Sequence, residues 1–198
     1  MAHAHSLSAL LASRICHDLI SPIGAISNGL ELLSMSGSPA TGPEITLIGD
    51  SVTQANARIR LFRIAFGIAS TGQLVGRQEL VTILSELTVG LRLRVEWIIP
   101  DEVTRAEAKL AVLLMMCVES AMPFGGRVQI TAQGQAWQIT GESLKLKVDP
   151  DLWRAFTQGT LEVTAPAQVQ FALALVEAEG MGRKLAVAQG KDRLTVSF

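Results

Sequence analysis

The sequence has few of the residues that build metal centres and strongly charged binding surfaces. It contains three histidines and two cysteines, and charged residues make up 18% of its 198 positions. The formal net charge of −1 gives no reason to expect nucleic acid or an anionic membrane as a partner. Hydrophobic residues reach 48%, which excludes a disordered chain and predicts a substantial buried core.

The cysteines and the apolar runs argue against a disulfide-bonded, metal-binding or membrane-spanning protein. Cys16 and Cys117 have no metal-ligand spacing and lie in helical patterns, so we expect reduced thiols. The longest uninterrupted apolar run, Leu110–Val118, is far shorter than the ~20 residues that span a bilayer. Residues 1–5 show no basic region followed by an apolar core, so no signal peptide is visible. We therefore expect a cytoplasmic protein without a metal site.

One histidine lies away from the start of the chain, on a helix expected from about Ser6 to Met35. Apolar residues recur there on the ~3.6-residue helical period and form one stripe: Ala12, Ile15, Leu19, Ile23, Ile26, Leu30 and Leu33. At about 100° per residue, His17 lies about 160° from the middle of this stripe. The helix is thus expected to pack on one side and to present the imidazole to solvent on the other.

The residues near His17 on the exposed face are mostly small. A neutral imidazole is a good nucleophile near neutral pH, and small neighbours leave room for another macromolecule to reach it. Pro22 cannot donate a backbone N–H, so the helix loosens or bends beside the histidine. This kink is either simply tolerated or improves access to the ring. The expected docking residues are Ser13, Ser21, Pro22, Gly24 and Asn28.

His17 stands in the motif His-Asp-Leu-Ile-Ser-Pro, residues 17–22. This motif resembles the H-box of two-component histidine kinases and phosphotransferases, in which the histidine is phosphorylated. In this interpretation His17 accepts the phosphoryl group, and Asp18 polarises or deprotonates its ring from the side. Arg14, one turn earlier, offsets charge on the phosphoryl oxygens. The alternative for Asp18 is an ordinary solvated acid on the helix surface, and the alternative for Arg14 is an ordinary solvated arginine.

A cluster of helix breakers at 36–43 predicts a turn before a second helix, from Pro43 or Glu44 to about Ile68. The two helices form an antiparallel hairpin. Apolar residues of the second helix alternate by three and four, the spacing of a bundle seam: Ile45, Ile48, Val52, Ala55, Ile59, Phe62 and Phe66. Further apolar residues lie off this seam: Leu61, Ile64, Ala65 and Ile68. This surplus indicates a homodimeric four-helix bundle or contact with a second domain.

A break at 71–76 divides the chain into a hairpin domain, 1–72, and a second domain, 73–198. The second domain alternates short helices and strands, which predicts an α+β two-layer sandwich. The expected elements are a helix at 78–90, a strand at 93–98, a buried helix at 105–122, strands at 128–131, 137–140 and 144–148, helices ending at 158 and spanning 166–179, and a hairpin at 184–188 and 193–198. Asp149 is expected to cap the helix that ends at 158.

This order of elements resembles the ATP-binding domain of histidine kinases, with Leu113–Ala121 in place of their N-box. The resemblance puts Ser120 where those kinases carry a magnesium-binding asparagine. Gly141–Leu144 replaces their Asp-x-Gly-x-Gly box, and Pro166–Phe171 replaces their second glycine-rich lid. Without the glycines, backbone N–H groups cannot close on phosphates, and without the asparagine the magnesium lacks a ligand. We therefore expect a degenerate domain that binds no ATP.

A phospho-acceptor hairpin fused to a degenerate kinase-like domain resembles the alphaproteobacterial histidine phosphotransferases of the ChpT type. The resemblance covers nearly the whole chain and is strongest at 17–22, 28–33 and 63–67. It implies a cytoplasmic homodimer that relays phosphoryl groups from the receiver domain of a hybrid histidine kinase to downstream response regulators. Mg²⁺ would come with the receiver, and no cofactor would be tightly bound. The alternatives are a divergent ATP-dependent histidine kinase and a non-catalytic dimeric scaffold that binds response regulators.

Overall fold

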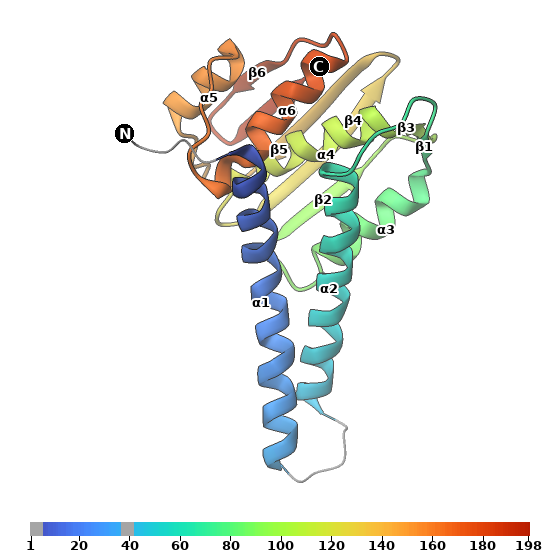
Figure 1. Ribbon diagram of the computed structural model, residues 1–198, viewed down its shortest axis with the longest axis vertical. Coiled ribbons are helices and arrows are strands. Elements are labelled where there is room, and N and C mark those ends of the chain that lie inside the picture. The colour runs from blue at the N-terminus through green and yellow to red at the C-terminus, as the bar shows by residue number, and fades with distance from the viewer. Residues whose placement is uncertain (1–5, 37–41) are drawn as a thin grey trace.

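A computed structural model describes residues 6–36 and 42–198. It shows a long helical hairpin that projects from an α/β domain (Figure 1). The helices are α1 (Leu7–Ser36), α2 (Pro43–Ala65), α3 (Arg77–Leu87), α4 (Arg105–Ser120), α5 (Pro150–Gln158), the 3₁₀ turn η1 (Pro166–Gln168) and α6 (Val169–Gly180). The strands are β1 (Leu74–Val75), β2 (Leu93–Trp97), β3 (Val103–Thr104), β4 (Gly126–Gln133), β5 (Ala136–Glu142), β6 (Ala186–Gln189) and β7 (Arg193–Ser197).

Helices α1 and α2 run side by side in opposite directions (Figure 1). They approach closely at Gly29, where an added Cβ would lie 2.6 Å from Ile48 Cγ1. Helix α1 continues through Pro22, as the apolar stripe predicted. Helix α2 ends at Ala65 rather than at the expected Ile68. Most of the turn predicted at 36–43 lies outside the described residues.

Part of the predicted apolar surplus of α2 is buried against the α/β domain. Leu61, Ile64 and Ala65 belong to the common core, whereas Ile68 is 88% exposed. Along the projecting part of the hairpin, large apolar side chains remain exposed on both helices: Ile20, Ile23, Leu30, Leu32, Met35, Ile45, Leu47, Val52 and Ile59. Within a single chain, the α/β domain thus covers some of the extra apolar side chains of α2. The apolar side chains on the projecting part of the hairpin stay exposed and form an open hairpin face.

The α/β domain is built on a five-stranded sheet with the strand order β2-β4-β5-β7-β6. Strands β2 and β4 are parallel, and the other neighbours are antiparallel. Helices α4 and α6 lie across one face of this sheet (Figure 1). The apolar run of α4 is buried throughout, from Leu110 to Val118. The predicted α+β architecture is confirmed, with α4 at the centre of the core.

Helix α1 is apolar enough over Leu7–Met35 to cross a membrane by length and composition alone. This is weak evidence, because helices of bundles and cores meet the same criterion. Here α1 packs along α2 and also contacts η1 and α6 of the α/β domain. We therefore interpret α1 as one half of a packed hairpin.

The strand expected at 144–148 is wrong. These residues form an irregular loop, in which the Lys147 N–H donates to the Ala121 carbonyl at 2.8 Å. Leu146 and Val148 pack against the core while the lysines face solvent, and Leu144, the first apolar residue of the pattern, is exposed as well. A loop held across the end of α4 therefore satisfies the same pattern as a strand. Strands β1 and β3, which pair with each other, were not predicted.

Candidate functional site

His17 lies on the part of α1 that is nearest to the α/β domain, and its side chain is 85% exposed. This confirms the orientation predicted from the helical period. An added Cβ at Gly24 would meet no neighbouring atom within 4 Å, so the surface after His17 is open. The predicted docking residues are exposed or half-buried around it: Ser13, Ser21, Pro22, Gly24 and Asn28.

Asp18 is buried beside this exposed ring, with only 8% of its side chain accessible. Its Oδ1 lies 3.2 Å from Nδ1 of His17. A carboxylate can only accept a hydrogen bond, so Nδ1 carries the proton in this contact. The lone pair of the neutral ring then lies on Nε2, the nitrogen away from Asp18. This arrangement makes Nε2 available as a nucleophile.

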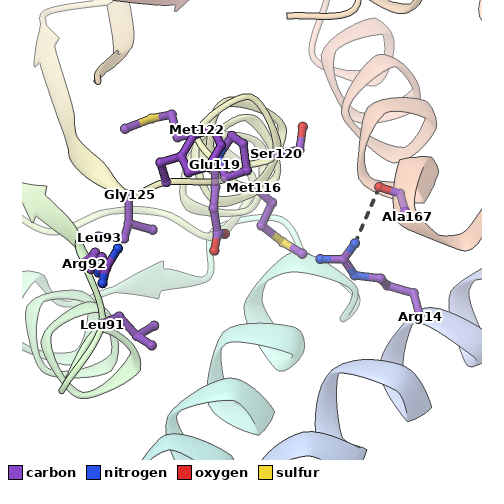
Figure 2. A pocket seen from close by; sticks show the side chains of 12 residues that line it. Arg14, Leu91, Arg92, Leu93, Met116, Glu119, Ser120, Met122, Gly125 and Ala167 are labelled. Atoms are coloured by element: carbon purple, nitrogen blue, oxygen red, sulfur yellow. Dashed lines mark hydrogen bonds between the residues drawn. The ribbon is translucent and has the colours of Figure 1, made fainter. Parts of the chain in front are cut away.

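Two arginines hold the other oxygen of Asp18. Nε of Arg14 donates to Oδ2 at 2.8 Å, and Nη1 of Arg58 lies 3.6 Å from the same atom. Arg14 also donates from Nη1 to the Ala167 carbonyl at 3.4 Å, a contact drawn in Figure 2. The structure thus places the guanidinium of Arg14 against the Asp18 carboxylate, one turn before His17. Its action on phosphoryl oxygens stays a prediction.

Sequence reasoning missed Arg58, which α2 contributes. No local motif marks it, because it stands in an ordinary helical segment far along the chain from Asp18. Only the packing register of α1 against α2 brings the two residues together.

A cavity of about 450 Å³ lies where α1, α4, η1 and the loops around 92 and 124 meet, and Arg14 of the charge cluster forms part of its lining (Figure 2). Arg14, Arg92, Glu119 and Ser120 line it, together with apolar side chains. The hydroxyl of Ser120 donates to the Cys117 carbonyl of its own helix at 2.6 Å. Over residues 6–36 and 42–198, no three His, Cys, Asp or Glu side chains gather in a way that could hold a metal ion.

Glu119 connects the α/β domain electrostatically to the cluster on the hairpin. Burial raises the pKa of this carboxyl above its ordinary value of 4.5, Arg58 and Arg14 oppose the shift, and Asp18 adds to it. Glu119 therefore binds its proton more tightly in the folded protein than in the unfolded chain.

We expect Glu119→Gln to stabilise the protein at neutral pH relative to the wild type. At pH values below the pKa of Glu119 in the unfolded chain, this carboxyl is protonated in both the folded and the unfolded protein. Its ionisation therefore does not affect the free energy of unfolding there. As pH rises through the interval from 4.5 to the folded pKa, the unfolded state loses its proton first and the wild type loses stability. Urea unfolding of both proteins at about pH 4 and about pH 8 measures the effect. The same stability difference at both pH values would contradict it.

Comparisons with known proteins agree with this description. Residues 77–193 match the family model for the histidine phosphotransferase C-terminal domain. The chain is 32% identical over 195 residues to protein phosphotransferase ChpT of Brucella abortus (strain 2308). The match covers 93% of this chain and 90% of that protein. A solved structure described as a bacterial phosphotransferase has a TM-score of 0.78 and 30% sequence identity, and the match covers 100% of this chain and 97% of that one.

These matches confirm the resemblance to histidine phosphotransferases of the ChpT type noted in the sequence. The family model and the Brucella relative between them account for both the hairpin and the α/β domain. The chain belongs to the histidine phosphotransferase family, as a phosphotransferase of the ChpT type.

Proposed function

We propose that this phosphotransferase relays phosphoryl groups between receiver domains through a phosphohistidine at His17. The observation that carries the proposal is the pairing of an 85% exposed imidazole with a buried carboxylate at its Nδ1. Exposure lets a macromolecular donor reach the ring, and the carboxylate leaves the lone pair on the outward nitrogen. In this scheme a hybrid histidine kinase supplies the donor receiver, downstream response regulators accept the group, and the relay takes place in the cytoplasm.

In the accepting step, Nε2 of His17 attacks the phosphorus of an aspartyl phosphate on the receiver. The new P–N bond forms as the P–O bond breaks, and its electron pair returns to the receiver's carboxylate. The ring gains positive charge, which the adjacent Asp18 carboxylate balances across the 3.2 Å contact. Mg²⁺ comes with the receiver, and the same step in reverse passes the group to a second receiver. Ser13, Ser21, Pro22, Gly24 and Asn28 form the docking surface.

Label transfer separates this proposal from its two alternatives. Radiolabel that moves from a phosphorylated receiver to the chain supports the relay. Radiolabel that arrives from ATP alone supports a divergent histidine kinase, and a chain that takes label from neither source supports a non-catalytic scaffold. Both donors are offered to the full-length protein, with the receiver's Mg²⁺ present throughout.

We further propose that the domain after residue 72 binds no ATP in this protein. Ser120, in the position of the magnesium-binding asparagine, has its hydroxyl turned to the Cys117 carbonyl. The segment that replaces the first glycine-rich box is also engaged, because Ser143 Oγ donates to the Gly125 carbonyl at 2.8 Å.

Titration calorimetry with Mg-ATP is therefore expected to show no binding at physiological nucleotide concentration. A competent histidine-kinase domain in the same buffer is the positive control. Micromolar affinity would contradict the proposal and favour the kinase alternative.

The open apolar face of the hairpin supports a homodimer joined as a four-helix bundle, with both His17 rings on the outside. A contiguous exposed apolar patch larger than a few hundred Å² promotes association. Because Ile59 is 45% exposed in the single chain, Ile59→Asp should break the dimer while the α/β domain stays folded. Sedimentation and circular dichroism measure the two effects.

The control is Gln189→Glu, which adds the same charge at an exposed position of β6, the edge strand of the five-stranded sheet. It should remain dimeric. A wild type that sediments as a folded monomer at micromolar concentration would disprove the arrangement.

A further inference from the structure

The contact between His17 and Asp18 depends on how the Asp18 side chain is held. Adjacent residues of a helix do not share a face, so the acid reaches the ring only in a particular rotamer. In that rotamer Oδ1 faces the imidazole and Oδ2 faces the two guanidinium groups. The two oxygens of Asp18 therefore have separate partners: the His17 ring contacts Oδ1, and the two arginines hold Oδ2.

Arg14 alone does not explain this division. A guanidinium fork tends to bind both oxygens of a carboxylate at once. Arg14 stands one turn before Asp18 on the same helix, and its Nη1 is directed to the Ala167 carbonyl instead. A second cation on Oδ2 opposes any rotation of the carboxylate that would bring Oδ1 onto Arg14 and away from the ring.

Arg58 is that second cation, and it comes from the facing helix. Only 27% of its side chain is accessible, so its attraction to the almost fully buried Asp18 is less screened than that of a surface pair. The position of α2 against α1 thus determines the orientation of the carboxylate beside the histidine.

We propose that Arg58 is a positioning residue, which fixes the Asp18 carboxylate from α2 so that His17 keeps its proton on Nδ1 and its lone pair on Nε2. The inference rests on the proposed role of His17 as the phosphoryl acceptor. Without Arg58 the carboxylate turns toward Arg14, the ring proton is free to move to Nε2, and the outward nitrogen loses its lone pair.

A purely structural role would have a different signature. Glu119 of α4 also attracts Arg58, so the arginine could serve only to balance charge between the hairpin and the α/β domain. In that case its loss would change stability and leave the tautomer of His17 as it is. The tautomer is therefore the deciding measurement.

The experiment uses the full-length protein with ¹⁵N-labelled histidine, at about pH 8, where a free imidazole is neutral. Long-range proton–nitrogen NMR distinguishes protonated from unprotonated ring nitrogens, and His17→Ala identifies the His17 signal. Arg58→Gln removes the charge, and Arg58→Lys keeps a cation near Oδ2. The matched control is Arg63→Gln, which removes an exposed arginine from the same helix.

We expect an unprotonated Nε2 in the wild type, in Arg63→Gln and largely in Arg58→Lys, and a mixture of tautomers in Arg58→Gln. Phosphorylation of His17 by phosphoramidate, a small donor that needs no receiver, should slow about tenfold in Arg58→Gln. It should recover most of its rate in Arg58→Lys.

An Arg58→Gln protein that keeps the wild-type tautomer overturns the inference, whatever its stability. That outcome leaves the proposed function untouched, because His17 could still accept the phosphoryl group. The proposed function fails by a separate result, in which His17→Ala still takes label from a phosphorylated receiver.

Discussion

His17→Ala is expected to abolish phosphoryl acceptance from a phosphorylated receiver while the protein stays folded. The imidazole supplies the attacking nitrogen, and alanine offers no replacement. Since the side chain is 85% exposed, its removal should cost less than about 0.5 kcal/mol of stability. Radiolabel transfer measures the first effect, and thermal unfolding followed by circular dichroism measures the second.

The neighbouring Cys16 provides the control, because its exposed thiol is another nucleophile on the same turn of α1. Cys16→Ala should accept label at the wild-type rate. If label were retained in His17→Ala and lost in Cys16→Ala, the acceptor would be the thiol and the phosphohistidine mechanism would be wrong.

Asp18→Asn is expected to slow phosphoryl transfer by about a hundredfold or more. The amide is uncharged, so it no longer balances the positive charge that the ring gains, and its NH₂ group competes for the ring nitrogen. The change also removes the carboxylate charge that Arg14 and Arg58 share at Oδ2 of Asp18 in a largely buried place, which should cost about 2 kcal/mol. Transfer rates and urea unfolding measure the two losses.

Asp50→Asn serves as the matched control, because Asp50 is an exposed acid on α2. It should change neither the rate nor the stability. A transfer rate in Asp18→Asn within a fewfold of the wild type would show that the acid does not orient or balance the ring.

Helical period made the exposure of His17 predictable, and capping chemistry made the start of α5 predictable. The outward orientation of His17 follows from its angle to the apolar stripe, and Asp149 caps α5 as expected by accepting the N–H groups of Asp151 and Leu152. Both features depend on residues within one or two turns. A single sequence contains all the information that they need.

Contacts between distant segments were not predictable in the same way. Arg58 meets Asp18 only through the register of two packed helices, and Glu119 faces them only because α4 docks beside the hairpin. The wrong strand at 144–148 has a related cause, since side-chain alternation does not reveal whether a neighbouring strand is available for pairing. The domain division at residue 72 remains a prediction.

Besides the shared core, hydrogen bonds join the α/β domain to both helices of the hairpin. Arg105 at the start of α4 donates to the Arg63 carbonyl near the end of α2, and Arg14 reaches the Ala167 carbonyl of η1 from α1. A domain that carries nucleotide to a side chain on another domain must be able to move. In the proposed relay this domain binds no ATP, so no such movement is needed. Joined to both helices, this domain lies beside the part of α1 that carries His17. If the proposed relay is correct, donor and acceptor receivers meet the same preorganised surface, and each can leave without a domain movement.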